Sequence, residues 1–384
     1  MGYGLGKDSP VVLTLGKENY ESLLLRHGQW IRWRVAEKCP CAVRDNMQPD
    51  PHCGRCAGLG LTYTWQKKRI VTQTVFVPDT SGIIEVLDEY EDCGLDFIHS
   101  FDGFVYPHAD KAGKYISLNT PNPPQKGAYL YAVMVQDSLK KVSAANCADA
   151  GGGYYRVEGL QSRRSGIDGL YHAAPGDIVR IGSIVDGGGA SHVPDEFRLD
   201  MFHVTPAGQG PIEPPVTATD IEYVPPYLFA LLSQDLFGND KTAVERAGGD
   251  GILTFPYNCD VSGDDVLTVF SGTYTQKEVV KRIEDADDTI SAYFVQEVVS
   301  CTGLQREFVK GKDYLLIGTN RVRWLCEDAP TVGEAYSISY RICPTYRVIK
   351  DIPQIRTGEN QRLPKKVVVK LYGTYGEKRG VNRQ

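Results

Sequence analysis

The stretch from Lys38 to Gly60, KCPCAVRDNMQPDPHCGRCAGLG, contains four of the chain's ten cysteines. They form two close pairs, Cys39-Pro-Cys41 and Cys53-Gly-Arg-Cys56. Zn²⁺ binds four tetrahedral ligands, and two close thiol pairs joined by a short loop supply all four from two tight turns. We therefore predict a structural zinc knuckle whose ligands are the thiolates of Cys39, Cys41, Cys53 and Cys56.

Other uses of the same four thiols stay open from the sequence alone. Two disulfides, or a redox-active pair of Cys53 and Cys56, would need no metal. Further alternatives are iron in place of zinc, unpaired thiols in a loop, and His52 in place of one cysteine. Metal catalysis is not expected, because four thiolates fill the coordination sphere, whereas a catalytic zinc keeps one position open for water or substrate.

The composition favours strands and turns over long helices. The 384 residues include 22 tyrosines, 40 glycines and 22 prolines, and these residue types are enriched in strands or in turns. A chain of this length usually folds into about two or three domains. We therefore expect a mainly β protein with more than one core.

The predicted fold has two β-sandwich or barrel-like regions joined by a proline-rich linker, with a short N-terminal helix and the zinc-knuckle loop. The linker, PAGQGPIEPPVTATDIEYVPP, is expected to run extended, because its prolines remove backbone donors and stiffen the chain. The predicted segments are 1–60 (N-terminal strand, helix and zinc knuckle), 61–205 (first β domain), 206–226 (linker), 227–361 (second β domain) and 362–384 (basic C-terminal tail).

Local patterns locate several elements within these segments. Asn19–His27 is expected to form the N-terminal helix, which ends at Gly28. Tyr336–Ile342, YSISYRI, alternates strictly between large and polar side chains, as a half-buried strand requires. Leu61–Trp65 is expected to be a strand as well, whereas YLFALLSQDLF from Tyr227 to Phe237 is expected to form a short docked helix.

The charge and the chain's ends narrow the class of protein. The formal net charge is −6 and the pI is about 5.7, which argues against a general nucleic-acid binder. We expect no secretory signal and no membrane span, because the first residues, MGYGLGKDSP, lack an apolar core and no long apolar run follows. Thiols then stay reduced in a cytosol, and the scattered cysteines are expected to be buried and free: Cys93, Cys147, Cys259, Cys301, Cys326 and Cys343.

No catalytic or cofactor-binding residue is predicted, and the chain is not expected to be an enzyme. It has no Gly-x-Ser-x-Gly elbow, no His-Glu-x-x-His, no phosphate-binding lysine loop, no dinucleotide glycine fingerprint and no His-x-Glu ahead of a cysteine pair. Its seven histidines are spread singly, at His27, His52, His99, His108, His172, His192 and His203. A lone histidine without a partner is weak evidence for a general base.

Two parts of the sequence resemble known proteins. The knuckle, with KCPC, DPHCGRC and the trailing GLG, resembles cysteine loops in virion proteins of tailed bacteriophages. Its second half is also similar to one zinc repeat of the DnaJ chaperones, but a single copy does not make a chaperone. The segment from Phe308 to Val348 contains FVKGKDY, Trp324, PTVGEAYSISY and PTYRV, and it resembles the β domains of phage neck, collar or baseplate components.

The resemblance implies a structural virion protein of a contractile-tailed phage, assembled in the host bacterial cytoplasm. It implies a homo-oligomeric ring at the neck or collar, the head-to-tail connection. The implied partners are portal or adaptor, tail terminator, sheath or baseplate proteins, with no membrane partner. A baseplate or tail position, and a zinc-knuckle nucleic-acid binder, remain alternatives. Interfaces favour Tyr, Trp and Arg, so the candidate anchors are Trp30, Trp33, Trp65 and Trp324.

Overall fold

The structure is a computed structural model, and it is mainly β with almost no helix. It describes residues 28–44, 48–53, 56, 58–100, 102, 104–151, 154–160, 162–165, 171–174, 176–192, 197–200, 203–206, 213–225, 227–233, 250–256, 259–270, 273–283, 287–292, 295–304, 306–317, 320–352 and 364–372. The predicted fold class is therefore confirmed in its coarse form, a mainly β chain with a cluster of four cysteines.

Six strands form a closed antiparallel barrel at the centre of the fold. In order around the barrel they are β1 (Gln29–Lys38), β19 (Tyr227–Ser233), β20 (Gly251–Phe255), β30 (Lys365–Leu371), β29 (Thr345–Ile352) and β21 (Val266–Val269). The pairing of β1 with β19 closes the ring. Large apolar side chains fill the interior, among them Trp33, Phe255 and Val348. Closure removes the unpaired edges that an open sheet would expose.

An arm leaves the barrel through strand β1, which is longer than its barrel partners. The first half of β1 pairs with β21, from Ile31 to Arg34, and the second half pairs with β2 (Leu61–Trp65) from Arg34 to Lys38. The short helix α3 (Pro40–Arg44) follows β1 directly. We call β1 beyond Arg34, α3, β2 and the loop between them the arm.

Three lobes are inserted between strands of the barrel. The first lobe packs two small sheets against each other: β3 (Lys68–Phe76), β8 (Tyr129–Asp137) and β5 (Gly94–Ser100) in one sheet, and β4 (Ile83–Glu85), β7 (Tyr115–Leu118) and β6 (Ala109–Ala112) in the other. The 3-10 helix η1 (Asp88–Tyr90) joins them. We call this the β3–β8 lobe.

The second lobe is an antiparallel sheet with its own core, and we call it the β9–β18 lobe. Its strands are β15 (Ser191–His192), β14 (Ser183–Val185), β18 (Val216–Val224), β9 (Lys140–Gly151), β10 (Tyr154–Val157), β17 (His203–Pro206) and β16 (Phe197–Asp200), with β13 (Asp177–Arg180) also paired to β18. Ile184, Ala218 and Ile221 lie in its core. A separate hairpin consists of β11 (Ser162–Ser165) and β12 (Tyr171–Ala174).

The third lobe is a sandwich between barrel strands β21 and β29, and we call it the β22–β28 lobe. One sheet holds β22 (Tyr274–Lys281), β28 (Ala335–Ile342), β24 (Val295–Thr302) and β25 (Glu307–Phe308), and the other holds β23 (Asp288–Thr289), β27 (Arg321–Trp324) and β26 (Tyr314–Ile317). Tyr314, Tyr336 and Tyr340 are buried in its core. The predicted alternation of Tyr336–Ile342 thus lies within β28.

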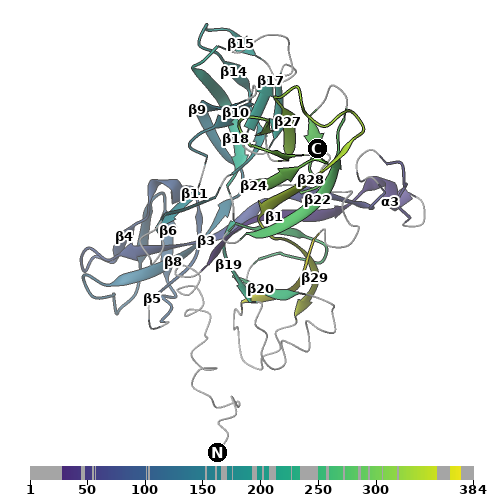
Figure 1. Cartoon of the computed structure of the whole chain (residues 1–384). Helices are drawn as coiled ribbons and strands as arrows, with labels where there is room; N and C mark the ends of the chain where they lie inside the picture. Colours follow the sequence, from purple (N-terminus) through teal and green to yellow (C-terminus); the bar gives the residue numbers. More distant parts are fainter. Residues whose placement is uncertain are drawn as a thin grey trace, which may run out of the picture.

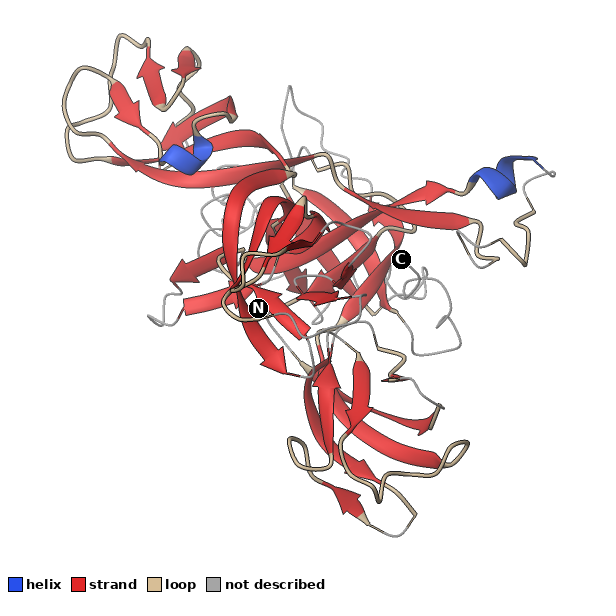
Figure 2. Ribbon diagram, turned by 90° about the horizontal axis from the view of Figure 1, so that it is seen from above, coloured by secondary structure: helices blue, strands red, loops and turns tan. Residues whose placement is uncertain are grey.

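Figure 1 shows how the parts are arranged around the barrel strands β1, β19, β20 and β29. The arm extends to one side and ends at α3, and the β3–β8 lobe extends to the opposite side. The β9–β18 lobe rises above both. Figure 2, seen from above, shows the same two extensions pointing away from the central body. The molecule therefore has two ends that differ in structure.

Two predicted features are wrong where the structure describes them. Residues 216–224 of the predicted linker form strand β18 rather than a free extended segment, because Val216, Ala218 and Ile221 are buried in the lobe's core. Tyr227–Ser233 forms strand β19 rather than a helix, because its backbone pairs with β1 and β20. The predicted N-terminal helix at 19–27 and most of the basic tail lie outside the described residues.

The sheets also cross the predicted domain boundaries. The barrel sheet joins β1 and β2, which lie before and after position 60, to strands from beyond position 226. The reason is physical: strand pairing depends on complementary backbone edges, which can be hundreds of residues apart in an antiparallel barrel. Local sequence patterns carry little information about such pairing.

A buried carboxylate connects the two sheets of the β22–β28 lobe. Asp288 is fully buried and accepts hydrogen bonds from Trp324 Nε1 (2.8 Å), the Tyr336 hydroxyl (3.0 Å) and the backbone N–H of Ile283 (2.8 Å). Replacement by Ala would leave these donors without their acceptor, and each unsatisfied buried group costs about 1–3 kcal/mol.

Asp288→Ala is therefore expected to lower the free energy of unfolding of this lobe by about 3 kcal/mol or more. The measurement is hydrogen exchange of the β27 and β28 amides, which reports on the lobe rather than on the whole chain. Asp328→Ala is the matched control, because Asp328 is 84% exposed and pairs with Arg306 only at 3.7 Å. Equal protection in the two variants would contradict this role for Asp288.

Candidate metal centre

Two adjacent segments at the end of the arm bring the four predicted ligands together. Cys39 follows the last residue of β1 and Cys41 lies in the first turn of α3. Cys53 and Cys56 lie in the returning loop before β2. The β1–β2 ladder ends at Lys38 and Leu61, and the N–H of Cys39 extends it by one hydrogen bond to the Gly60 carbonyl (2.8 Å). The ladder therefore fixes how close the two cysteine pairs come.

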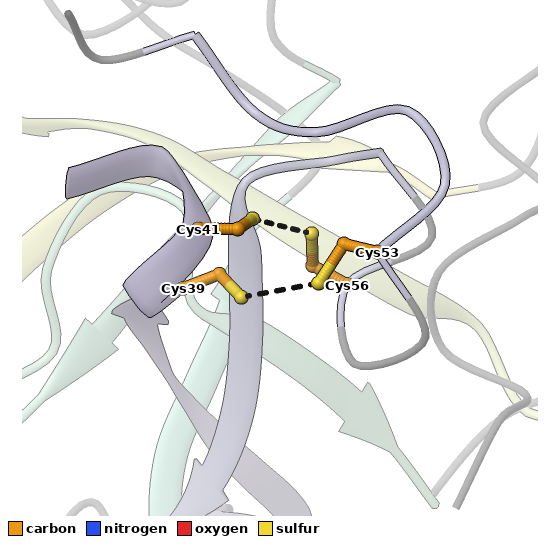
Figure 3. Close-up of side chains that lie close together, drawn as sticks. All are labelled: Cys39, Cys41, Cys53 and Cys56. Atoms are coloured by element: carbon orange, nitrogen blue, oxygen red, sulfur yellow. Dashed lines mark hydrogen bonds between the residues drawn. The ribbon is translucent and has the colours of Figure 1, made fainter. Parts of the chain in front are cut away.

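The four sulfur atoms have the spacing of a tetrahedral tetrathiolate site. All four Sγ atoms lie within 4.8 Å of one another. Cys39 Sγ is 3.8 Å from Cys53 Sγ, and Cys41 Sγ is 3.5 Å from Cys56 Sγ (Figure 3). A Zn–S bond of about 2.3 Å places the sulfurs of a regular tetrahedron about 3.8 Å apart. The four sulfurs are therefore close enough for one metal of this size to bind them all after small shifts of the side chains.

The electrostatics of the cluster favour a cation at its centre. Burial raises the pKa of the Cys41 thiol to about 12, a hydrogen bond from the Asp50 backbone lowers it, and hydrogen bonding to Cys39, Cys56 and Cys53 raises it further. Without a cation, four thiolates this close together would repel one another. A divalent metal removes that cost, because it stabilises the deprotonated form of each ligand.

The tip of the arm has little else to hold it together. Cys39 (0% exposed) and Cys56 (2% exposed) are buried, but none of the four cysteines belongs to a hydrophobic cluster of the described residues. The tip's own contacts are backbone bonds such as Cys53 N–H to Asp50 O (3.1 Å) and Leu59 N–H to Cys56 O (2.9 Å). A segment without a core usually needs a metal or disulfides for stability.

The two glycines after Cys56 allow the loop to fold back. Gly58 has φ +84° and Gly60 has φ +73°, in the left-handed region where a side chain is strained. A Cβ on Gly58 would lie 3.1 Å from the Cα of Pro51, and one on Gly60 would lie 3.2 Å from the Cβ of Pro49. The glycines therefore bring the returning chain close to the segment that carries Cys53.

Gly58→Ala is expected to weaken metal binding, because it adds left-handed strain of about 1–2 kcal/mol. This corresponds to a decrease in affinity of roughly 5- to 30-fold, which competition with a chromogenic chelator can measure. Gly263→Ala is the control, because a Cβ on Gly263 would meet no atom within 4 Å and the backbone there has no positive φ. Identical chelator curves for the two variants would show that the turn does not position the ligands.

Buried groups fix the base of the arm where β1 leaves the barrel. The Asp265 carboxylate is fully buried and accepts hydrogen bonds from Trp33 Nε1 (3.0 Å), Ala36 N–H (2.8 Å) and Ser262 N–H (3.0 Å). Burial raises the pKa of Asp265, and these bonds oppose the rise. The Arg34 guanidinium lies 4.2 Å from the centre of the Trp65 ring, a cation–π contact between the two strands of the arm.

Asp50 and Asp265 also shape the site, although neither is among the residues predicted from the sequence. Asp50 sits before Pro51, and its side chain accepts the His52 N–H at 2.8 Å, so the Asp-Pro-His-Cys turn was a readable signal. Asp265 lies more than 200 residues from its partners in β1, and no local pattern marks it. His52 itself is exposed and lies outside the cysteine cluster.

The other cysteines do not join the cluster, and no disulfide links any of the ten. Four of them are buried as expected: Cys93, Cys259, Cys301 and Cys343. Cys147 and Cys326 are only partly buried, so that part of the expectation is wrong. Burial raises the pKa of Cys147 to about 11 and that of Cys301 and Cys343 to about 12. These thiols are poor nucleophiles at neutral pH.

The histidines whose contacts the structure describes lie in packed or turn positions, or on the surface. His99 is buried and stacks against Phe97 and Tyr131, with ring centres 5.6 and 5.2 Å away. His192 Nε2 lies 3.3 Å from Asp186 Oδ2, in a turn that Asp186 closes by accepting the N–H of Ala190. His108 is exposed.

Comparison of the sequence with protein families and with curated proteins finds no match. Within the described residues, no helix combines the length and the apolar character that crossing a membrane requires. The candidate site therefore rests on its own geometry: four cysteines at one end of a β arm, spaced for a metal.

Proposed function

We propose that this chain is a structural subunit of a tailed-bacteriophage virion. It assembles with copies of itself into a ring at the neck or collar, where head and tail join, and a structural Zn²⁺ holds the tip of its arm. The role is non-enzymatic, and the neighbours are other virion proteins such as the portal or adaptor, the tail terminator and the sheath.

The arm is the observation that carries this proposal. It extends beyond the barrel (Figures 1 and 2) as two strands with the cysteine cluster at the end. A two-stranded hairpin is at best marginally stable in water on its own. A chain that stiffens such an extension at both ends, with Asp265 at the base and four cysteines at the tip, has a rigid element suited to contact with another subunit.

Zn²⁺ is the metal that the donor set favours. Tetrahedral sites of four thiolates are typical of zinc and of iron–sulfur centres, whereas calcium and magnesium prefer oxygen ligands. A closed set of four ligands, with no position left for water, is typical of structural rather than catalytic zinc. The metal would therefore stabilise the tip and supply no reaction.

The two ends of the molecule supply the two different surfaces that a closed ring requires. Residues 70–130, in the β3–β8 lobe, contain nine carboxylates and three lysines, a net charge of −6 that equals the charge of the whole chain. Exposed apolar side chains at Ile83 and Leu87 lie in the same lobe. The arm is neutral, because residues 35–65 contain three acidic and three basic side chains, and Leu59 on the arm is 40% exposed. The acidic lobe and the neutral arm are therefore two different surfaces, as head-to-tail contact requires.

The four candidate tryptophan anchors differ in whether they pack in a hydrophobic core. Trp33 packs in the barrel core and Trp324 packs in the β22–β28 lobe, where it donates to Asp288. Trp30, Trp65 and Trp324 are all partly buried, but Trp30 and Trp65 belong to no hydrophobic cluster of the described residues. Interface anchors need exposure in the free subunit, so Trp30 and Trp65 are the better candidates of the four.

Electron microscopy of the purified protein tests the assembly. The expected result is closed rings, either alone or after addition of portal, adaptor or tail proteins from the same particle. Labelling of intact particles distinguishes a neck or collar position from a baseplate or tail position. A monomer under all conditions, with no co-assembly, contradicts the proposal, and tight retention on DNA at physiological salt would favour a nucleic-acid binder instead.

A further inference from the structure

We propose that the same four cysteines form two specific disulfides, Cys39–Cys53 and Cys41–Cys56, when the metal site is oxidised. The inference rests on the cysteine site of the proposed function and adds a second, metal-free state that keeps the arm tip closed. A particle built in a reducing cytosol and released into an oxidising medium would then retain the folded tip in both environments.

The sulfur positions select this pairing among the three that four cysteines allow. The two short contacts are Cys39 Sγ to Cys53 Sγ at 3.8 Å and Cys41 Sγ to Cys56 Sγ at 3.5 Å. Figure 3 shows both as parallel bridges between the strand-and-helix segment and the returning loop. Each pair needs only a small approach to form a bond, and both bridges fasten the same two segments that the metal would fasten.

The pairing of neighbours in the sequence, Cys39 with Cys41 and Cys53 with Cys56, is disfavoured by the geometry of Cys39 and Cys41. Cys39 and Cys41 are two residues apart at the start of α3, with Pro40 between them. Side chains two apart in a helical turn do not face each other, and proline fixes the backbone between them. If Cys53 paired with Cys56, Cys39 and Cys41 would therefore have no suitable disulfide partner. The single bridge would lie within the returning loop and would not join it to the strand-and-helix segment.

The chemistry balances with a peroxide as the oxidant. Two molecules of hydrogen peroxide and four protons react with the four metal-bound thiolates. Two S–S bonds form as the four sulfurs lose four electrons, both O–O bonds break, and the products are two disulfides, four waters and the released divalent ion. Attack passes through a sulfenic acid on one sulfur, and the nearest thiolate then displaces water from it. Proximity of each pair therefore decides the product.

The sequence makes the pairing easy to read by tryptic mapping without reduction. Trypsin cuts after Lys38, Arg44, Arg55 and Lys67, so Cys39 and Cys41 share one peptide while Cys53 and Cys56 fall in two others. The proposed pairing joins all three peptides in one species. Local pairing would instead join the Cys53 and Cys56 peptides and leave the first peptide separate.

Single variants separate the two crossed pairings. After peroxide treatment, Cys39→Ser is expected to link the first peptide to the Cys56 peptide, and Cys41→Ser to link it to the Cys53 peptide. Cys326→Ser is the control, because Cys326 is partly buried and outside the cluster, and it should give the parental three-peptide species. Blocking with iodoacetamide before digestion prevents exchange.

The experiment begins with the metal content of the untreated full-length chain. Release of one metal per chain with loss of the four thiols and appearance of the three-peptide species supports the inference. A Cys53–Cys56 bridge, the reversed partners in the single variants, or oxidation of the four cysteines to sulfonic acid overturns it. Chains that lack metal yet form the proposed bridges would contradict only the structural zinc, and rings that lack these bridges would contradict only this inference.

Discussion

The double variant Cys53→Ser, Cys56→Ser is expected to lose its metal and to unfold the tip of the arm while the barrel stays folded. Structural Zn²⁺ contributes about 10–16 kcal/mol of apparent binding free energy at pH 7, and two serines leave only two of the four ligands. The tip has no hydrophobic core of its own among the described residues. Its order therefore depends on the cluster.

Two measurements check this result. Metal content should fall from about one ion per chain to none, and hydrogen exchange should accelerate at the amides of Cys39 and Leu59, which bond to Gly60 O and Cys56 O. Amides in the barrel strands β20 and β30 should keep their protection. Cys326→Ser is the matched control. A double variant that keeps the tip protected and assembles like the parent would show that the cluster does not hold the arm.

Breaking the buried ion pair between Arg32 and Asp177 is expected to destabilise the attachment of the β9–β18 lobe to the barrel. Arg32 Nε lies 2.5 Å from Asp177 Oδ2, and both side chains are buried, with exposures of 6% and 5%. Ile31 and Trp33 face the barrel interior, so Arg32 points outward, where strand β13 of the β9–β18 lobe covers it. The pair thus joins the barrel wall to the lobe.

Arg32→Ala should lower stability by about 3–5 kcal/mol, because it leaves the Asp177 charge buried without its partner. Calorimetry or hydrogen exchange should show the β9–β18 lobe separating or unfolding before the barrel, since a multi-lobed chain need not unfold in one step. The apolar pair Arg32→Met, Asp177→Leu should recover most of the loss, because buried ion pairs contribute little beyond apolar packing.

Arg341→Ala is the matched control for this prediction. Arg341 and Glu297 form an ion pair at 3.0 Å whose side chains are 53% and 56% exposed, and exposed pairs contribute about 1 kcal/mol or less. If Arg32→Ala cost no more than Arg341→Ala, the buried pair would not be what fastens the lobe to the barrel.

The sequence was most informative where the signal is local. Leu61–Trp65 is a strand with the predicted bounds, and the alternation of Tyr336–Ile342 is repeated in the burial of β28 except at Ser339, which is buried as well. The four cysteines come together as their spacing predicts. In each case the determining contacts lie within a few residues, so the residue pattern carries the information.

The errors arise where distant contacts decide the structure. YLFALLS at 227–233 is apolar on every side, which suits a buried helix as well as a barrel strand, and only its pairing with β1 and β20 selects the strand. Val216–Val224 follows two prolines but continues a sheet begun at β9, more than sixty residues earlier. The buried partners Asp177, Asp265 and Asp288 are likewise set by tertiary contacts.

Native mass spectrometry of the purified chain reports both its assembly and its bound metal in one spectrum. We expect a homo-oligomer whose mass equals a whole number of chains with one zinc ion each. We also expect the zinc to be absent when the four cysteines are replaced. A monomer without metal, with the thiols of Cys39, Cys41, Cys53 and Cys56 free or bridged as isolated, would contradict the proposed function.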